Sequence, residues 1–151
     1  MLRYPCDSGS RFRAANRRNA HALQPQPHRP DRALAVRDVD ASEAFYRDTP
    51  GLRHLFRFGD LTFFDCCGVR LFIEKANEAS AIGRASPLYF TCADLILGVQ
   101  ELKKRNVAFT HEPHLIAKME DHDLWMAFFE DPDGNTLALM HEAPKGYAPR
   151  G

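Results

Sequence analysis

The chain of 151 residues lacks three features that would assign it at once to a class of protein. No stretch approaches the ~20 consecutive apolar residues that a membrane-spanning helix needs, so we expect no membrane partner. The first residues lack the apolar segment of a secretion signal, which favours a cytoplasmic location. The four cysteines lack C-x-x-C spacing, which argues against a zinc ribbon and predicts free thiols in a reducing compartment.

The chain also lacks a net charge, because 20 Lys and Arg residues balance 20 Asp and Glu residues. This balance hides two unlike parts. Residues 1–32 carry seven Arg against two acidic residues, a net charge of +5. The rest of the chain carries 13 basic and 18 acidic residues, a net charge of −5. Because binding to phosphates needs a basic surface, the acidic body argues against a nucleic-acid partner.

Residues 1–30 form a basic segment with almost no apolar periodicity. Its prolines at positions 25, 27 and 30 exclude a continuous helix or a central strand. Three interpretations compete: a targeting leader, a basic arm for an acidic partner, and a disordered extension without function, such as an over-long start. We favour the last. The composition changes near Asp31, so we expect one domain over residues 31–144 and a flexible tail over residues 145–151.

A pattern occurs twice within that domain, over residues 31–76 (module one) and residues 86–142 (module two). In each module a short apolar run leads to an Asp, Asp38 or Asp94, at the position of a helix N-cap. The helix-like segments that follow cover residues 41–47 and 95–105.

Each module then continues with strand patterns. Residues 53–58 and 107–111 each supply a strand, and two further strands follow around a Gly-containing turn. Each module therefore reads β-α-β-β-β. At ~50 residues neither module buries a core alone, so we predict an α+β fold of two paired modules.

The motifs of this repeat resemble those of the vicinal oxygen chelate superfamily, which includes glyoxalase I, bleomycin-resistance proteins and extradiol dioxygenases. The resemblance rests on F-Y-R-D-x-x-G-L at residues 45–52 and D-P-D-G-N at residues 131–135. It implies two βαβββ modules that form a cup-shaped, curled mixed sheet, a homodimer and, often, a divalent metal. It does not fix the reaction, because the scaffold hosts lyases, isomerases, dioxygenases and pure binders.

The resemblance also implies four metal-ligand positions, two in each module. They fall on Asp31, Phe72, Pro87 and Ala138. Only Asp31 has a side-chain donor, so we predict no metal ligands and no cofactor. A divalent metal stays as an alternative, through the His- and acid-rich segments 111–114 and 120–123. We expect these segments mainly as a loop at the rim of the cup, or as a lid that contacts substrate.

Alternation along the strands then predicts which side chains line the cup. If Phe72 faces the cup, Arg70 and Glu74 do so too. Arg70 suits an anion, because its guanidinium binds carboxylates bidentately, and Glu74 is the candidate general base. The predicted substrate-binding residues are Arg70, Phe72, Tyr89, His122 and Trp125. Two alternatives remain: Arg70 pairs with Glu74, and Trp125 belongs to the core.

Three functions compete. The first is a metal-dependent lyase, isomerase or dioxygenase. The second is a binder that holds a small organic molecule in the inter-module cup without the usual metal site. The third is an inactive divergent member. The lack of metal ligands favours the binder, because enolisation and dioxygen chemistry rely on the charge of the metal. Whether the protein is an enzyme stays open.

Overall fold

The fold is known from a computed structural model, which describes residues 31–148. Within them the order β-α-β-β-β occurs twice, so the predicted repeat and the α+β class are confirmed. Module one comprises β1 (Asp31–Val36), α1 (Val39–Asp48), β2 (Arg53–Phe58), β3 (Leu61–Cys66) and β4 (Val69–Lys75). A short 3-10 helix, η1 (Ala79–Ala81), lies between the modules. Module two comprises β5 (Leu88–Thr91), α2 (Leu95–Lys104), β6 (Phe109–Lys118), β7 (His122–Glu130) and β8 (Thr136–Pro144). The interpretations of residues 1–30 fall outside the described residues.

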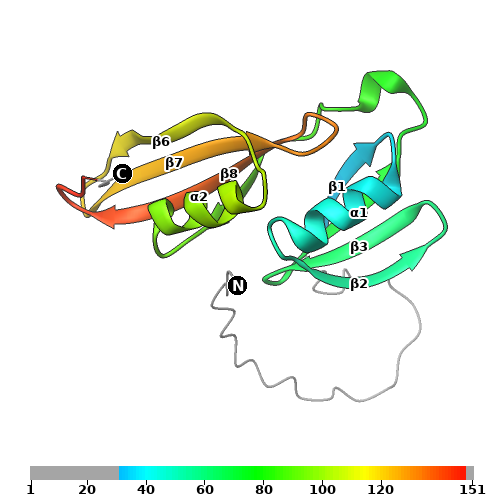
Figure 1. The fold of residues 1–151 in the computed structure, drawn as a ribbon, viewed down its shortest axis with the longest axis horizontal. Coiled ribbons are helices and arrows are strands. Elements are labelled where there is room, and N and C mark those ends of the chain that lie inside the picture. The colour runs from blue at the N-terminus through cyan, green and yellow to red at the C-terminus, as the bar shows by residue number, and fades with distance from the viewer. Residues whose placement is uncertain (1–30, 149–151) are drawn as a thin grey trace, which may run out of the picture.

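Each module forms one four-stranded mixed sheet. The strand orders are β1-β4-β3-β2 and β5-β8-β7-β6, and the first pair in each sheet is parallel. Figure 1 shows the two sheets as separate units with α1 and α2 in front of their own sheets. Within residues 31–148, no helix covers the other face of either sheet. The sheets do not close on each other, which agrees with an open, curled cup.

Both helices begin at the predicted N-caps. The Asp38 carboxylate accepts hydrogen bonds from the amides of Asp40 (2.9 Å) and Ala41 (3.2 Å). Asp94 accepts one from the amide of Leu97 (3.0 Å). These carboxylates satisfy backbone donors that have no partner within the helix, and this is why each strand-to-helix corner carries an Asp.

Alternation along the central strands separates core from open face. On β4, Leu71 and Ile73 are fully buried in the core, whereas Phe72 between them is only half-buried and lies outside the core cluster. On β8, Leu137 and Leu139 belong to the core in the same way. The core cluster contains residues of both modules, so the modules stabilise each other.

The two motifs of the sequence meet at the junction between the modules. The Tyr46 hydroxyl on α1 donates to Asp131 Oδ2 after β7, at 2.9 Å, and both groups are buried. Asp131 also accepts from Asn135 Nδ2 (2.8 Å). Nearby, the amide of Arg37 donates to Asp133 Oδ2 (3.1 Å). The D-P-D-G-N turn of module two therefore binds module one through hydrogen bonds to the carboxylates of Asp131 and Asp133.

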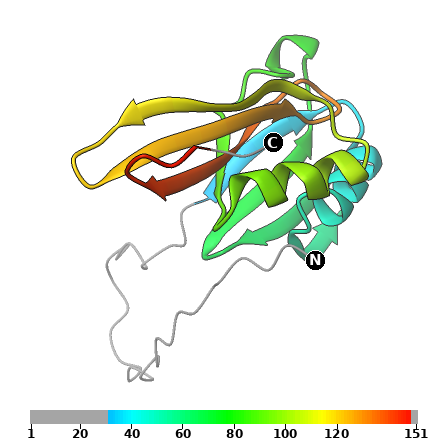
Figure 2. The same cartoon turned by 60° about the vertical axis from the view of Figure 1, so that its left-hand side comes forward.

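Residues 111–123 are not the loop that the sequence predicted. They form most of the β6–β7 hairpin, which extends past the end of α2 in both views (Figures 1 and 2). Three irregularities in the pairing of β6 with β7 interrupt the alternation of β6, and so hide the strand from a reading of the sequence.

Two further expectations were that the cysteines are free thiols and that no helix spans a membrane. Free thiols are confirmed for Cys66 and Cys92, whereas Cys67 is disulfide-bonded, so the expectation is wrong there. Among residues 31–148 no helix is both long and apolar enough to cross a membrane.

Candidate functional site

The helix-free face of module one carries a ladder of stacked phenyl rings. The ring of Phe63 on β3 lies 4.4 Å from Phe56 on β2 and 5.1 Å from Phe72 on β4, measured between centroids. The planes differ by 27° and 17°, so all three rings lie nearly parallel. We call Phe56, Phe63, Phe72, Arg70 and Glu74 the module-one face.

Two charged side chains of β4 share this face with the ladder. The Arg70 guanidinium lies 5.5 Å from the centroid of the Phe63 ring. Glu74 lies two residues beyond Phe72 and pairs with Leu61 on β3. The structure thus brings three of the predicted site residues together: Arg70, Phe72 and Glu74. An aromatic surface beside a guanidinium can hold a flat ring that bears an anionic group.

The helix-free face of module two also carries aromatic side chains. Tyr89 on β5 pairs with Ala138 on β8, and Ala138 pairs with Phe128 on β7. Tyr89 is 51% exposed, so its ring is available to a bound molecule. Across from Phe128 lie the imidazoles of His111 and His114 on β6, each 5.8 Å from the phenyl ring. We call Tyr89, Phe128, His111 and His114 the module-two face.

The structure places Trp125 on the other side of this sheet. Trp125 alternates with Phe128 and Met126, packs against the core, and meets Tyr147 edge-on at 5.8 Å. The surroundings of Trp125 therefore agree with the alternative that it is a core residue. They give no support to the prediction that Trp125 stacks on a substrate. The sequence could not settle this, because Trp is compatible with both faces of a strand.

His122 lies on the side of Phe128 but at the far end of β7. Six residues separate the two, or about 20 Å along a strand. The His122 ring contacts Asp121 Oδ1 at 2.8 Å, and this hydrogen bond lowers the pKa of the Asp121 carboxyl. His122 is therefore remote from Tyr89 within this chain.

Three of the four positions that the resemblance implies for a metal offer no side-chain donor. Phe72 belongs to the ring ladder and Ala138 is fully buried without a donor atom. The carbonyl of Pro87 accepts a hydrogen bond from Arg32 (3.4 Å). Elsewhere in residues 31–148, no group of three or more His, Cys, Asp or Glu side chains is placed to hold a metal ion.

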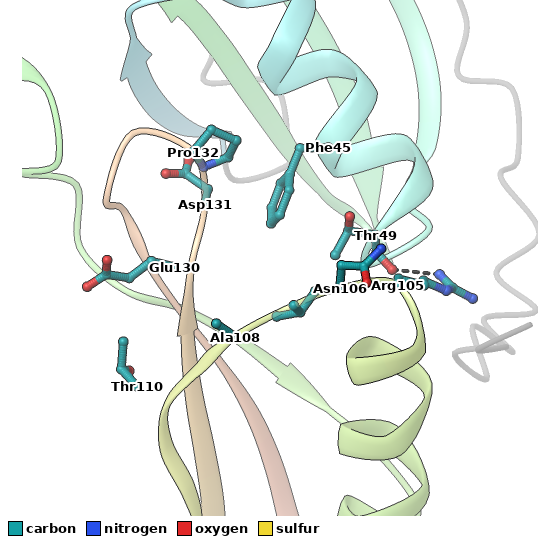
Figure 3. A pocket seen from close by; sticks show the side chains of 10 residues that line it. Phe45, Thr49, Arg105, Asn106, Ala108, Thr110, Glu130, Asp131 and Pro132 are labelled. Carbon is teal, nitrogen blue, oxygen red and sulfur yellow. Dashed lines mark hydrogen bonds between the residues drawn. The ribbon is translucent and has the colours of Figure 1, made fainter.

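A hollow of about 370 Å³ opens at the junction of the modules (Figure 3). Its walls come mainly from α1, from the segment between α2 and β6, and from the turn after β7. Its lining residues are Phe45, Thr49, Arg105, Asn106, Val107, Ala108, Thr110, Glu130, Asp131 and Pro132. None of the predicted site residues lines it. No pattern in the sequence predicts this hollow, because its walls come from three distant segments.

Three of the polar side chains that line this hollow, Arg105, Thr110 and Asp131, are already bonded to the protein. Arg105 Nη1 donates to the carbonyls of Asp48 (3.1 Å) and Thr49 (2.6 Å). Asp131 is bonded to Tyr46 and Asn135, and Thr110 Oγ1 donates to a carbonyl on β7. Because Arg105 and Asp131 serve to join the protein's own segments, the hollow fits a seam between modules better than a ligand site, so the helix-free faces are the candidate site.

Comparison with known proteins adds evidence independent of this geometry. The family model described as the Glyoxalase/Bleomycin resistance protein/Dioxygenase superfamily matches residues 26–139. A glyoxalase/bleomycin resistance protein/dioxygenase from Alicyclobacillus acidocaldarius is 19% identical with a TM-score of 0.64, covering 77% of this chain and 92% of its own. No curated protein matches the chain.

Two other solved structures share the fold. A lactoylglutathione lyase from Agrobacterium tumefaciens is 22% identical with a TM-score of 0.61, and the match covers 78% of this chain and 95% of that one. An antibiotic-binding protein from Streptomyces sp. CB03234 is 21% identical with a TM-score of 0.64, and the match covers 79% and 98%. At these identities the likeness establishes the fold and not the activity.

Proposed function

Because the chain belongs to the glyoxalase/bleomycin resistance protein/dioxygenase superfamily, we propose that it binds a small aromatic organic anion in its cup without the usual metal site. The observation that carries the proposal is the ladder of Phe56, Phe63 and Phe72 with Arg70 beside it. The antibiotic-binding protein from Streptomyces shares this fold, which supports a role in binding.

The ladder is suited to stacking because its outer ring is open. Phe56 is 49% exposed, an unusual position for a phenylalanine that serves only to fill a core. Each offset-stacked aromatic pair adds about 0.5–1.5 kcal/mol beyond the burial of its area. The positive charge of Arg70 beside the Phe63 ring then favours a ligand that carries an anionic group.

Calorimetric titration of the full chain with aromatic carboxylates, and with aliphatic carboxylates of similar size, tests the proposal. We expect the aromatic series to bind more tightly, and Arg70→Gln to weaken that binding at least tenfold, as expected for a lost charge-assisted hydrogen bond. Arg47→Gln is the matched control, because Arg47 is an exposed arginine on α1 that pairs with Asp48. Equal affinities of Arg70→Gln and the native protein would remove Arg70 from the site.

The enzyme alternative is tested on the same face through Glu74. If the bound molecule is turned over, Glu74→Gln should abolish turnover while leaving affinity within a few fold, as expected for a general base. A metal-dependent reaction through the usual four positions would need donors that Phe72, Pro87 and Ala138 do not have.

We further propose that the protein is cytoplasmic and that a second copy of the chain completes the cup. Next to the ladder, Phe58 is 77% exposed on the edge strand β2, and a large ring in water favours burial against a partner. Sedimentation equilibrium should report a dimer that Phe58→Glu weakens. A monomer at all concentrations would contradict this assembly.

A further inference from the structure

We propose that His111 and His114 on β6 form a two-histidine site for a divalent transition-metal ion of the kind that prefers imidazole ligands, such as Zn²⁺. This site uses none of the four positions considered above. It lies on the module-two face, where the imidazoles of both histidines on β6 lie next to the ring of Phe128 on β7.

Irregular strand pairing is what brings the two imidazoles together. In a regular strand, residues three apart point to opposite faces. Here His111 pairs with Phe128 and His114 pairs with Met126, and the register shifts between these pairs. Because paired residues lie on the same face, and Phe128 and Met126 are two residues apart, both histidines face the same side. Such bulges often re-aim side chains at functional sites.

The spacing of the rings suits a shared ion. Their centroids lie 6.0 Å apart, with an angle of 51° between the planes. A zinc ion about 2.1 Å from one nitrogen of each ring, at a nearly tetrahedral bond angle, sets the ring centres roughly 5–6 Å apart. The observed spacing of the ring centres is therefore close to the spacing that one shared ion requires.

The surroundings prepare one imidazole for coordination. His114 Nδ1 lies 2.8 Å from the carbonyl oxygen of Glu112, which accepts a hydrogen bond from it. This bond keeps the proton on Nδ1 and leaves the Nε2 lone pair free, as is usual for histidines that bind metals. The His111 ring has no hydrogen-bond partner within residues 31–148, so both of its nitrogens are available.

The carboxylate nearest in sequence does not compete for the site. Glu112 lies between the two histidines, but its Oε1 contacts Lys103 Nζ on α2 at 2.6 Å. Because α2 covers the other face of the sheet, Glu112 is turned away from the imidazoles. Two protein ligands leave the remaining coordination positions of the ion to water, or to an oxygen of a bound molecule.

Calorimetric titration of the full chain, without a histidine tag, with ZnCl₂ tests this site. We expect each of His111→Ala and His114→Ala to weaken one zinc-binding event at least tenfold, and the double variant to remove it. Glu112→Gln is the matched control and should keep the site, since its carboxylate points to Lys103. With Co²⁺ as the probe, a visible d–d spectrum that depends on both histidines would report direct coordination.

Two results would overturn the proposal: no zinc binding up to ~1 mM, or binding that is unchanged in the double variant. In the second case the ion is held elsewhere on the chain. His111→Gln/His114→Gln, which preserves side-chain polarity and size, guards against loss of folding, and melting curves without metal check both double variants. Arg70→Gln should leave zinc binding unchanged, so this test is independent of the proposed aromatic ligand.

Discussion

Replacing Tyr46 with Phe should loosen the junction between the two modules without opening a cavity. The substitution removes only the hydroxyl that donates to Asp131 Oδ2 at 2.9 Å, and the fully buried ring keeps its contacts with Phe45 and Phe64. The loss therefore isolates one buried hydrogen bond to a carboxylate.

The magnitude follows from what Asp131 retains. Hydrogen bonds to charged groups contribute about 1.5–3 kcal/mol. Asp131 keeps three other donors, namely the amides of Asp133 (2.9 Å) and Asn135 (2.8 Å) and the side chain of Asn135 (2.8 Å). Its charge is thus still solvated, and we expect the lower part of the range, about 1.5–2 kcal/mol, or a melting temperature about 5–8 °C lower.

Urea unfolding followed by circular dichroism measures this loss. The midpoint should fall at an unchanged slope, since the surface exposed on unfolding hardly changes. Tyr147→Phe is the control, because the Tyr147 hydroxyl has no hydrogen bond within residues 31–148, and it should cost less than about 0.5 kcal/mol. If Tyr46→Phe costs no more than this control, the Tyr46–Asp131 bond does not hold the modules together.

Two further predictions concern pH and the helix caps. Burial raises the pKa of Cys66 to about 12 and that of Cys92 to about 11 from an ordinary value of 9.0. The unfolded chain then loses these protons first, so the stability is fully present below pH 9.0 and falls as the pH rises towards 11–12. Unfolding measured across this range should show the decline, and Cys92→Ala should flatten it; a stability that is constant to pH 11 contradicts the burial. Separately, Asp38→Ala and Asp94→Ala should each cost about 1 kcal/mol by removing a cap, and costs near zero would show that water replaces the carboxylates equally well.

The local structure of this protein was largely predictable from its sequence. The caps at Asp38 and Asp94 depend on neighbouring backbone amides, and residues 53–58 became β2 as predicted. Alternation along β4 predicted which of its side chains share the open face, because the pattern involves a single strand with regular pairing. The grouping of Arg70, Phe72 and Glu74 on one face follows from the same rule.

The prediction was wrong where pairing is irregular. Residues 111–123 carry polar side chains and a proline at position 113, and their bulges break the period of two that identifies a strand. The faces of His111 and His114 follow from register with β7, a property of two strands that neither segment encodes alone.

The sequence by itself thus determined the two βαβββ modules, their caps, the open face of β4 and the lack of side-chain donors at three of the four positions that the resemblance implies for a metal. These features depend on interactions between residues close in the chain, or on side-chain chemistry that no fold can alter. Only the tertiary structure decided the junction through Tyr46 and Asp131, the side of the sheet on which Trp125 lies, the distance of His122 from Tyr89, and the meeting of His111 with His114. Each of these depends on register and packing between distant segments, where the geometry of one strand is set by its partner.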